Sequence, residues 1–482
     1  MAAVRTSFAE FERIYHRELT FWKEDMTRRE ALKLAGGGFG MFGLANVLHG
    51  QASAGPLAPK APHFPAKVKN VIFLFLNGGI SQVDTFDPKP ALTKHDGEPM
   101  PGPKIKTDRA SGNLMRSPYQ FQKCGKSGLE VSEIFPKIGS LIDDFCVIRS
   151  TYTDIGNHDA GLLMMNCGHT QLGRPSMGSW LTYGLGTENQ NLPGFVVLCP
   201  GYPTMGAELW SCAFLPAVYQ GTYIPNQEKD PLKMIQNIRN QDLSKTDQKE
   251  ELNLLDRLNR SYFGRVGHEA ELESHIQSLE TAFRMQTEAP EVFDISKESE
   301  ATRARYGTSD FGRGCLMALR MVEKGVRIVE VYFGNGQPWD SHDDILVHGQ
   351  LARDADPAIA ALVQDLKSRG LFDSTVVLVG SEFGRTPMIQ NSGLEKVCYG
   401  RDHNPPGFTT LIAGGGFKGG IAYGATDDFG FKAVENRAHV HDVHATILHQ
   451  LGIDHTRLTY RYSGRDFRLT DVGGNVIREI LA

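Results

Sequence analysis

Aspartate, glutamate and histidine residues follow several apolar runs of the sequence, at places where predicted strands end. Such side chains supply what a divalent-metal site needs: carboxylates bring charge, and neutral imidazoles favour zinc, manganese or iron over calcium. We keep zinc, manganese and calcium as candidate ions. The expected metal ligands are Asp84, Asp340, His342, Glu382, His403, His439 and His441.

Each of these residues has an ordinary structural alternative. A single acidic residue or histidine is more often a surface or capping group, and Asp442 could simply cap the helix that begins there. Two arginines, Arg385 and Arg401, carry planar guanidinium groups that are suited to ester oxygens. The Glu382 to Arg385 segment could instead be a structural turn whose arginine holds a carboxylate.

The elements that must position these residues alternate along the chain. Continuous apolar runs predict strands at 71–76, 145–148, 195–198, 327–333, 375–379 and 409–413. Helical periodicity occupies 303–324, 351–369 and 442–451, and a charged stretch at about 226–305 predicts a helical insertion. This order predicts an α/β fold with a largely parallel central sheet and helices on both faces. The ligand site of such a sheet lies beyond the carboxyl ends of its strands.

Composition sets limits on the class of protein. The 482 residues are 40% hydrophobic and 22% charged, which excludes a mainly disordered or multi-spanning membrane protein. The net charge of −5 gives no basic field for nucleic acid, so no nucleic-acid partner is expected. Seven scattered cysteines without a CxxC pair indicate neither a zinc knuckle nor a disulfide scaffold.

The N-terminal segment has the features of an export signal. Arg28 and Arg29 precede a glycine-rich apolar run at 34–48, and a small-x-small site ends at Ala54. We expect residues 1–54 to be a twin-arginine signal peptide, which places the protein in the periplasm or on the cell surface. A retained amphipathic helix is the alternative. The apolar run is too short and glycine-rich for a stable membrane span. After the signal peptide we expect a linker at 55–70 and a main domain at 71–475.

Several ordered motifs together resemble the bacterial DUF1501 family, of the kind abundant in planctomycetes. They are Trp339-Asp340-x-His342, the segment from Ser381 to Pro387, Gly400-Arg401-Asp402-His403, Ala413 to Gly416, and the tail from Gly464 to Asp471. That family is usually placed in the alkaline phosphatase/sulfatase superfamily. The resemblance implies a central sheet between helices, one or two divalent metals, and hydrolysis of phosphate or sulfate esters. The implied substrate is a small-molecule or polysaccharide ester.

The superfamily pattern is only partly matched. Its metal-binding aspartate after the first strand is replaced by Asn77, with Asp84 the nearest substitute. Its nucleophile position falls on His158 within the Gly156–Gly161 turn, which makes His158 a candidate catalytic residue or ligand. A structural histidine bonded to the turn's backbone is the alternative reading. Asp340 and His342 match a metal position that His439 or His441 could complete, while Glu382 is followed by Phe383 where a histidine belongs, unless His403 replaces it.

These departures leave two functions open. The first is an exported metal-dependent ester hydrolase whose nucleophile is an activated water or a transiently phosphorylated His158. The second is a non-catalytic exported binding or cell-surface protein on a degenerated hydrolase fold.

Overall fold

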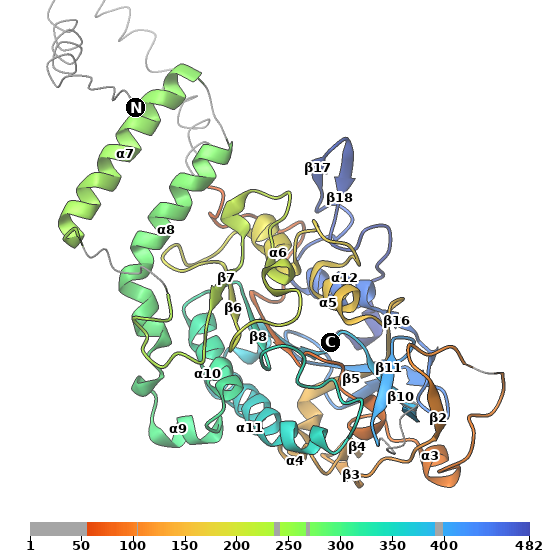
Figure 1. Cartoon of the computed structure of the whole chain (residues 1–482). Coiled ribbons are helices and arrows are strands. Elements are labelled where there is room, and N and C mark those ends of the chain that lie inside the picture. The colour runs from red at the N-terminus through yellow and green to blue at the C-terminus, as the bar shows by residue number, and fades with distance from the viewer. Residues whose placement is uncertain (1–54, 104, 236–241, 267–269, 391–398) are drawn as a thin grey trace, which may run out of the picture. The chain divides into compact units, whose positions relative to one another are not determined.

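A large sheet forms the centre of the molecule (Figure 1). The computed structural model describes residues 55–482 except 104, 236–241, 267–269 and 391–398; the expected signal peptide lies outside the described residues. In this part of the chain the sheet order is β13 (Ile421–Tyr423), β5 (Phe145–Tyr152), β12 (Phe408–Gly414), β9 (Thr375–Gly380), β1 (Asn70–Phe75), β8 (Ile328–Tyr332), β6 (Phe195–Leu198) and β7 (Thr222–Ile224), and β16 (Ala438–His439) also pairs with β5. Every predicted apolar run overlaps one of these strands, with Leu76, Arg327 and Phe333 just outside the strand ends.

Among the described strands of this sheet, β12 alone runs antiparallel to its neighbours. The central strands are buried along their whole length, as the continuous apolar runs require. Alternate residues enter opposite cores, since Ile72 and Leu74 lie in one apolar cluster whereas Val71 and Phe73 lie in the other.

Helices cover both faces of the sheet, which confirms the predicted fold class. One core is completed by α4 (Pro136–Ser140), α10 (Asp310–Glu323) and α11 (Val347–Ser368). The other is completed by α5 (His158–Cys167), α6 (Met177–Leu185) and α12 (Val440–Gln450). Figure 1 shows the two groups on either side of the strands.

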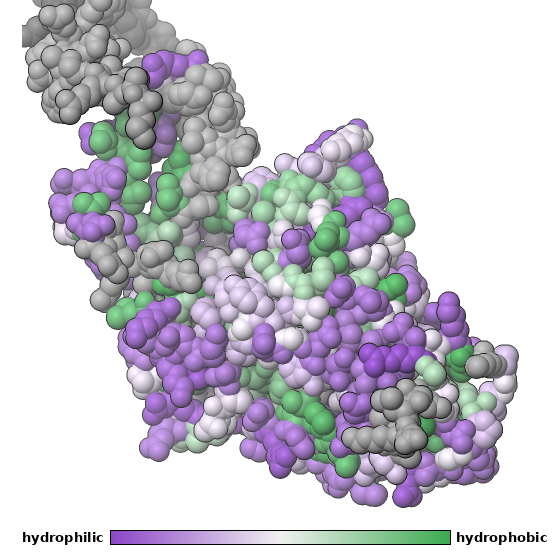
Figure 2. Space-filling model, viewed as in Figure 1, coloured by the Kyte–Doolittle hydropathy of each residue, from purple (hydrophilic) through white to green (hydrophobic). Residues whose placement is uncertain are grey.

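The expected insertion is helical. It contains α7 (Lys245–Val266), α8 (Ala270–Phe293) and α9 (Glu300–Arg305). Leu254 and Leu258 on α7 are half-exposed, and green apolar patches mark this helix in Figure 2. Of the described helices, none combines the length and apolar character needed to cross a membrane.

Smaller sheets and a short helix surround the central sheet. A three-stranded sheet of β11 (Arg401–Asn404), β10 (Gly384–Gln390) and β2 (Ser111–Leu114) begins where β9 ends. The remaining elements are α3 (Pro90–Lys94), β3 (Phe121–Cys124), β4 (Leu129–Ser132), β14 (Ala425–Thr426), β15 (Ala433–Glu435), β17 (Tyr460–Tyr462) and β18 (Arg465–Phe467).

The segment before β1, expected to be a linker, is held against the body. The Lys60 amide donates to the Leu185 carbonyl at 2.9 Å, and the Lys67 amide donates to the Gln450 carbonyl at 2.9 Å. Val68 is buried. This stretch is therefore part of the folded domain.

Candidate metal centre

Segments beyond one edge of the central sheet, together with β11 of the three-stranded sheet, bring four of the predicted residues together. His158 opens α5 after β5, Asp340 and His342 lie in the loop after β8, and His403 lies on β11. One ligand atom of each lies within 4.8 Å of one from every other. We call these four residues the histidine–aspartate cluster.

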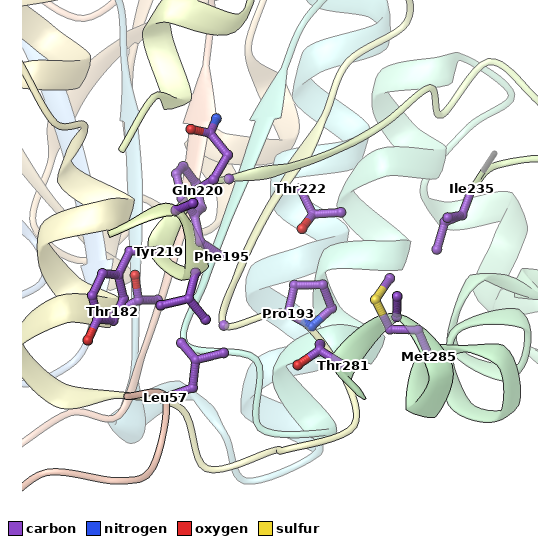
Figure 3. A pocket seen from close by; sticks show the side chains of 15 residues that line it. Leu57, Thr182, Pro193, Phe195, Tyr219, Gln220, Thr222, Ile235, Thr281 and Met285 are labelled. Atoms are coloured by element: carbon purple, nitrogen blue, oxygen red, sulfur yellow. The ribbon is translucent and has the colours of Figure 1, made fainter. Parts of the chain in front are cut away.

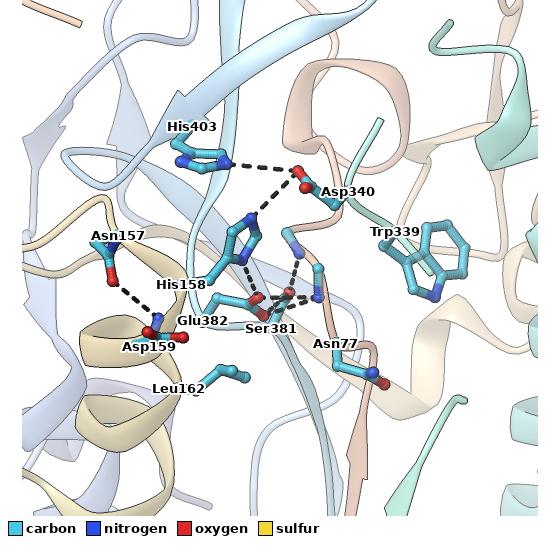
Figure 4. A network of polar contacts seen from close by, with 12 residues as sticks. Asn77, Asn157, His158, Asp159, Leu162, Trp339, Asp340, Ser381, Glu382 and His403 are labelled. Carbon is cyan, nitrogen blue, oxygen red and sulfur yellow. Dashed lines mark hydrogen bonds and ion pairs between the residues drawn. The ribbon is translucent and has the colours of Figure 1, made fainter. Parts of the chain in front are cut away.

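Local packing explains how His158 reaches this point. The Asn157 side chain caps α5 by accepting a hydrogen bond from the Asp159 amide at 3.0 Å (Figure 4). One turn later Gly161 lets the helix approach the loop after β9, because a Cβ there would lie 3.2 Å from the Phe383 ring. The first residue of α5 therefore points at the end of β9.

Asp340 Oδ1 is the centre of the cluster. It lies 2.9 Å from His342 Nε2, 3.2 Å from His158 Nε2 and 3.4 Å from His403 Nε2. Arg385 Nη2 also donates to it at 2.6 Å. Burial opposes ionisation of this carboxyl, but the histidine contacts and the Arg385 charge hold its pKa well below its usual range. Asp340 is therefore a carboxylate, and Figure 4 shows two of these contacts.

The Nδ1 atoms of His158 and His342 point away from the cluster, and their hydrogen bonds fix the orientation of the two rings. His158 Nδ1 lies 2.8 Å from Glu382 Oε1, and His342 Nδ1 contacts Gln390 Oε1. Both partners are acceptors, so each Nδ1 carries a proton and each ring turns its Nε2 towards the cluster. An acceptor oxygen behind a ligating histidine is the usual second layer of a metal site.

His158 Nε2 is the orphan atom of the cluster. It is buried and has no hydrogen-bond partner of acceptable geometry. Burial lowers the pKa of His158, but the contacts with Asp340 and Glu382 outweigh this and raise it to about 9. With no cation bound, a proton therefore occupies Nε2, and a divalent cation would compete for the same lone pair.

The donor set of the cluster fits a transition metal. Three imidazole nitrogens and one carboxylate oxygen are a set that zinc accepts in tetrahedral geometry. Calcium takes six to eight oxygen ligands, which this cluster does not offer.

Glu382, expected to be a ligand, stands behind His158 instead. Its carboxylate is fully buried and also accepts hydrogen bonds from the Gly78 amide at 3.0 Å and Ser381 Oγ at 2.8 Å. Burial opposes its charge, yet the His158 contact lowers the pKa of Glu382 overall. The carboxylate that orients His158 is therefore Glu382.

Arg385 and Arg401 are not placed to bind an ester. Both are fully buried, and Arg385 Nε donates to the Gly79 carbonyl at 2.8 Å in addition to holding Asp340. Arg401 Nε lies 2.7 Å from Asp84 Oδ2 and Nη2 lies 3.2 Å from Asp84 Oδ1. Both arginines therefore hold carboxylates, and Asp84 belongs to this buried ion pair and not to the cluster.

His439 and His441 also lie outside the cluster. His439 Nδ1 accepts the His441 amide at 3.1 Å and caps α12, while its Nε2 lies 3.3 Å from Asp154 Oδ2. His441 Nε2 lies 2.7 Å from the Gly168 carbonyl. Asn77 likewise serves the backbone, since its Nδ2 donates to Gly334 at 2.9 Å.

A serine of the cluster loop has a histidine partner that cannot activate it. Ser341 Oγ lies 3.1 Å from His348 Nδ1, and His348 Nε2 accepts the Ser81 amide at 3.0 Å. The ring proton therefore sits on Nδ1 and points at the serine. Burial also lowers the pKa of His348 to about 3. His348 is thus a donor to Ser341 and not its base.

Sequence reasoning missed Gln390, which lies at the end of β10 and orients His342. No motif marks a glutamine for this role, and its contact with His342 spans 48 positions. An apolar pocket of about 310 Å³ lies elsewhere, between α6, α8 and strands β6 and β7 (Figure 3). None of the four cluster residues lines it.

Replacing Glu382 by glutamine should weaken metal binding by about 10–100-fold, because an amide fixes the ring of His158 less well than a carboxylate does. Competition with a coloured chelator measures the affinity. Asp159→Asn is the matched control, since this exposed carboxylate lies next to His158 in sequence but does not contact its ring. Equal affinities of the two variants would contradict the role given to Glu382.

The fold and the site define an α/β protein with a candidate metal centre at the carboxyl edge of a mostly parallel sheet. Residues 68–481 match the family described as "Protein of unknown function (DUF1501)", and the chain therefore belongs to that family. This confirms the family resemblance of the sequence motifs. No curated protein matches the sequence.

Several solved structures are distantly similar to the chain. The lipoteichoic acid synthase LtaP from Listeria monocytogenes is 11% identical, with 86% of this chain and 78% of that chain covered and a TM-score of 0.33. The PsFucS1 sulfatase from Pseudoalteromonas sp. is 12% identical over 89% and 72% of the two chains, with a TM-score of 0.32. The phosphonate monoester hydrolase SpPMH from Silicibacter pomeroyi is 12% identical over 86% and 76%, with a TM-score of 0.33. Likenesses this weak carry no argument about function, which must come from the residues.

Proposed function

We propose that this protein is a metal-dependent hydrolase of phosphate or sulfate esters. The observation that carries the proposal is the convergence of three imidazole nitrogens on Asp340 Oδ1, one of which, His158 Nε2, is buried without a hydrogen-bond partner of acceptable geometry. We propose His158, Asp340, His342 and His403 as the ligands, and zinc as the ion that best fits them.

When bound, such an ion would polarise an ester oxygen and lower the pKa of a coordinated water. The charge of the centre with an ion bound suits an anionic substrate. Asp340 and Glu382 contribute two negative charges and Arg385 one positive charge, so these side chains sum to −1 when the three imidazoles act as neutral ligands. A divalent ion changes this to +1, which attracts a phosphate or sulfate group.

The chain residues point to water as the nucleophile. Neither ring nitrogen of His158 is free to attack an ester, because Nδ1 is held by Glu382 and Nε2 would bind the proposed ion. Ser341 is held by a histidine that donates to it, and Ser381 is fully buried. Asp340 is the most exposed side chain of the cluster, at 22%, so substrate approaches from its side.

We further propose a small-molecule or polysaccharide ester as the substrate class and the alkaline phosphatase/sulfatase superfamily as the wider relationship. The motifs that run from Trp339 to His403 support both, since they supply three of the four proposed ligands and the residues behind them. The same motifs suggest the planctomycete branch of the family.

We also propose export through the twin-arginine route. Replacing Arg28 and Arg29 by lysines keeps the charge but should abolish export, because such a receptor reads the guanidinium pair. Cell fractionation of the full chain measures this. Normal export of the lysine variant would contradict the proposed address.

A non-catalytic binding protein is the second candidate. The observation that favours it is that no hydroxyl or thiol among the described residues is placed and activated to attack an ester at the cluster. Such a protein would hold the metal and bind an anion without turnover.

Turnover by the untagged, metal-loaded protein separates the two candidates. We expect hydrolysis of an aryl phosphate or aryl sulfate, and loss of both metal and activity in His158→Ala. His441→Ala is the matched control, because this histidine follows another strand at the same sheet but lies outside the cluster. A metal-loaded protein that leaves both esters intact would support the binding protein, and a protein that takes up no metal would contradict both.

A further inference from the structure

We propose that a second divalent cation binds on the far side of His403, so that this imidazole bridges two ions. The ligands would be His403 Nδ1 and the carboxylates of Asp108 and Asp402. One potential ligand atom of each lies within 4.8 Å of one from the other two. The proposal rests on the proposed function, because His403 Nε2 serves the first ion.

His403 Nδ1 is a second orphan atom. The side chain is 94% buried, and Nδ1 has no hydrogen-bond partner. The nearest carboxylate oxygen, Asp108 Oδ2, is 3.5 Å away, which is too far for a good hydrogen bond. His158 and His342 differ in this respect, because each has a close acceptor behind its Nδ1.

The lack of a partner at His403 Nδ1 becomes energetically unfavourable once the first ion is bound. If the neutral ring gives its Nε2 lone pair to that ion, its proton must sit on Nδ1, buried and without an acceptor. A second cation resolves this by taking the Nδ1 lone pair while the proton leaves to solvent. The ring then coordinates through both nitrogens.

The two carboxylates complete a harder site than the first. Asp402 is fully buried, and its oxygens are oriented by the amides of Arg109 at 2.6 Å and His403 at 2.8 Å. Asp108 is half-exposed and opens the site to solvent. Two carboxylates and one imidazole suit manganese or zinc, and the added charge would serve the same anionic substrate.

Asp108 could serve either as a ligand of a second ion or as an acceptor that only orients His403, and the two roles predict different numbers of bound ions. A carboxylate that only accepts the Nδ1 proton would strengthen the first site without adding a second. Stoichiometry therefore decides between the two roles.

The test is a calorimetric titration of the metal-stripped full chain with Zn²⁺, repeated with Mn²⁺. We expect two equivalents for the unaltered protein, and for Asp108→Asn one tight equivalent with the second weakened at least tenfold. Asp154→Asn is the matched control, because it removes an exposed aspartate beside a buried histidine nitrogen, His439 Nε2, that belongs to neither site. It should keep two equivalents.

One equivalent in the unaltered protein, with ester hydrolysis intact, would overturn the second site and leave the proposed function standing. Two equivalents that persist in Asp108→Asn would also overturn it. No binding at all would overturn the first site as well.

Discussion

Replacing Asp340 by asparagine is expected to empty the metal centre and to lower ester hydrolysis by roughly 10²–10³-fold, the range found when a major electrostatic contact is removed. Asp340 Oδ1 is the only carboxylate oxygen of the histidine–aspartate cluster within 3.4 Å of all three imidazoles. Asparagine keeps the shape but loses the charge that balances the ion and Arg385. Elemental analysis and aryl ester turnover of the purified variant measure the effect.

Asp344→Asn provides the control from the same loop. Asp344 is exposed and its Oδ1 accepts the Leu346 amide at 2.9 Å, so it stays outside the cluster. This variant should keep the metal and the activity. Thermal unfolding of both metal-stripped variants shows whether the buried Arg385 charge also lowers stability. An Asp340→Asn protein with normal metal content would refute the proposed ligand set.

Replacing Asp84 by alanine is expected to lower the free energy of unfolding by about 3–5 kcal/mol, the usual cost of breaking a buried ion pair. Asp84 and Arg401 are both fully buried, and two of the guanidinium nitrogens point at this carboxylate. Without it, a buried charge has no counterion. The metal bound per folded molecule should stay the same, since Asp84 lies outside the cluster.

Urea unfolding and elemental analysis of the same preparation test this prediction. Asp96→Ala is the control, because Asp96 forms an exposed contact of 3.5 Å with Arg116, and such pairs contribute about 1 kcal/mol or less. If Asp84→Ala lost metal at unchanged stability, the ligand role first suggested by the sequence would be correct.

The fold could be predicted from the sequence because parallel strands that are buried on both faces consist of continuous apolar runs. The runs at 71–76 and 375–379 became β1 and β9, which pair in parallel register. The antiparallel direction of β12 could not be predicted from the sequence. A strand buried on both faces has the same apolar pattern in either direction, so nothing in 409–413 distinguishes an antiparallel neighbour.

The candidate site could be predicted from the sequence only in part. The sequence shows which residues follow predicted strands, but not which side chains they contact. The expectation that loops meet at one sheet edge placed His158, Asp340, His342 and His403 near one another, although they come from three separate segments of the chain. Which groups face the centre depends on long-range pairing, and Asp84 meets Arg401 across 317 positions. No local pattern encodes such a pair.

The misplaced histidines have a topological explanation. His439 ends the short strand β16 and His441 follows it, but β16 pairs with β5, away from β1 and β9. His158 follows β5 too, yet α5 carries it back to the end of β9 through the contact of Gly161 with Phe383. The order of elements along the sequence does not show that α5 brings His158 back to the end of β9.

Anomalous diffraction at the zinc edge from crystals of the full, untagged protein tests the central claim most directly. We predict a peak surrounded by His158 Nε2, His342 Nε2, His403 Nε2 and an Asp340 oxygen, at about 2.0–2.2 Å from each. Crystals grown with zinc that show no peak at this position, or whose zinc lies at His439 and His441 instead, would contradict it.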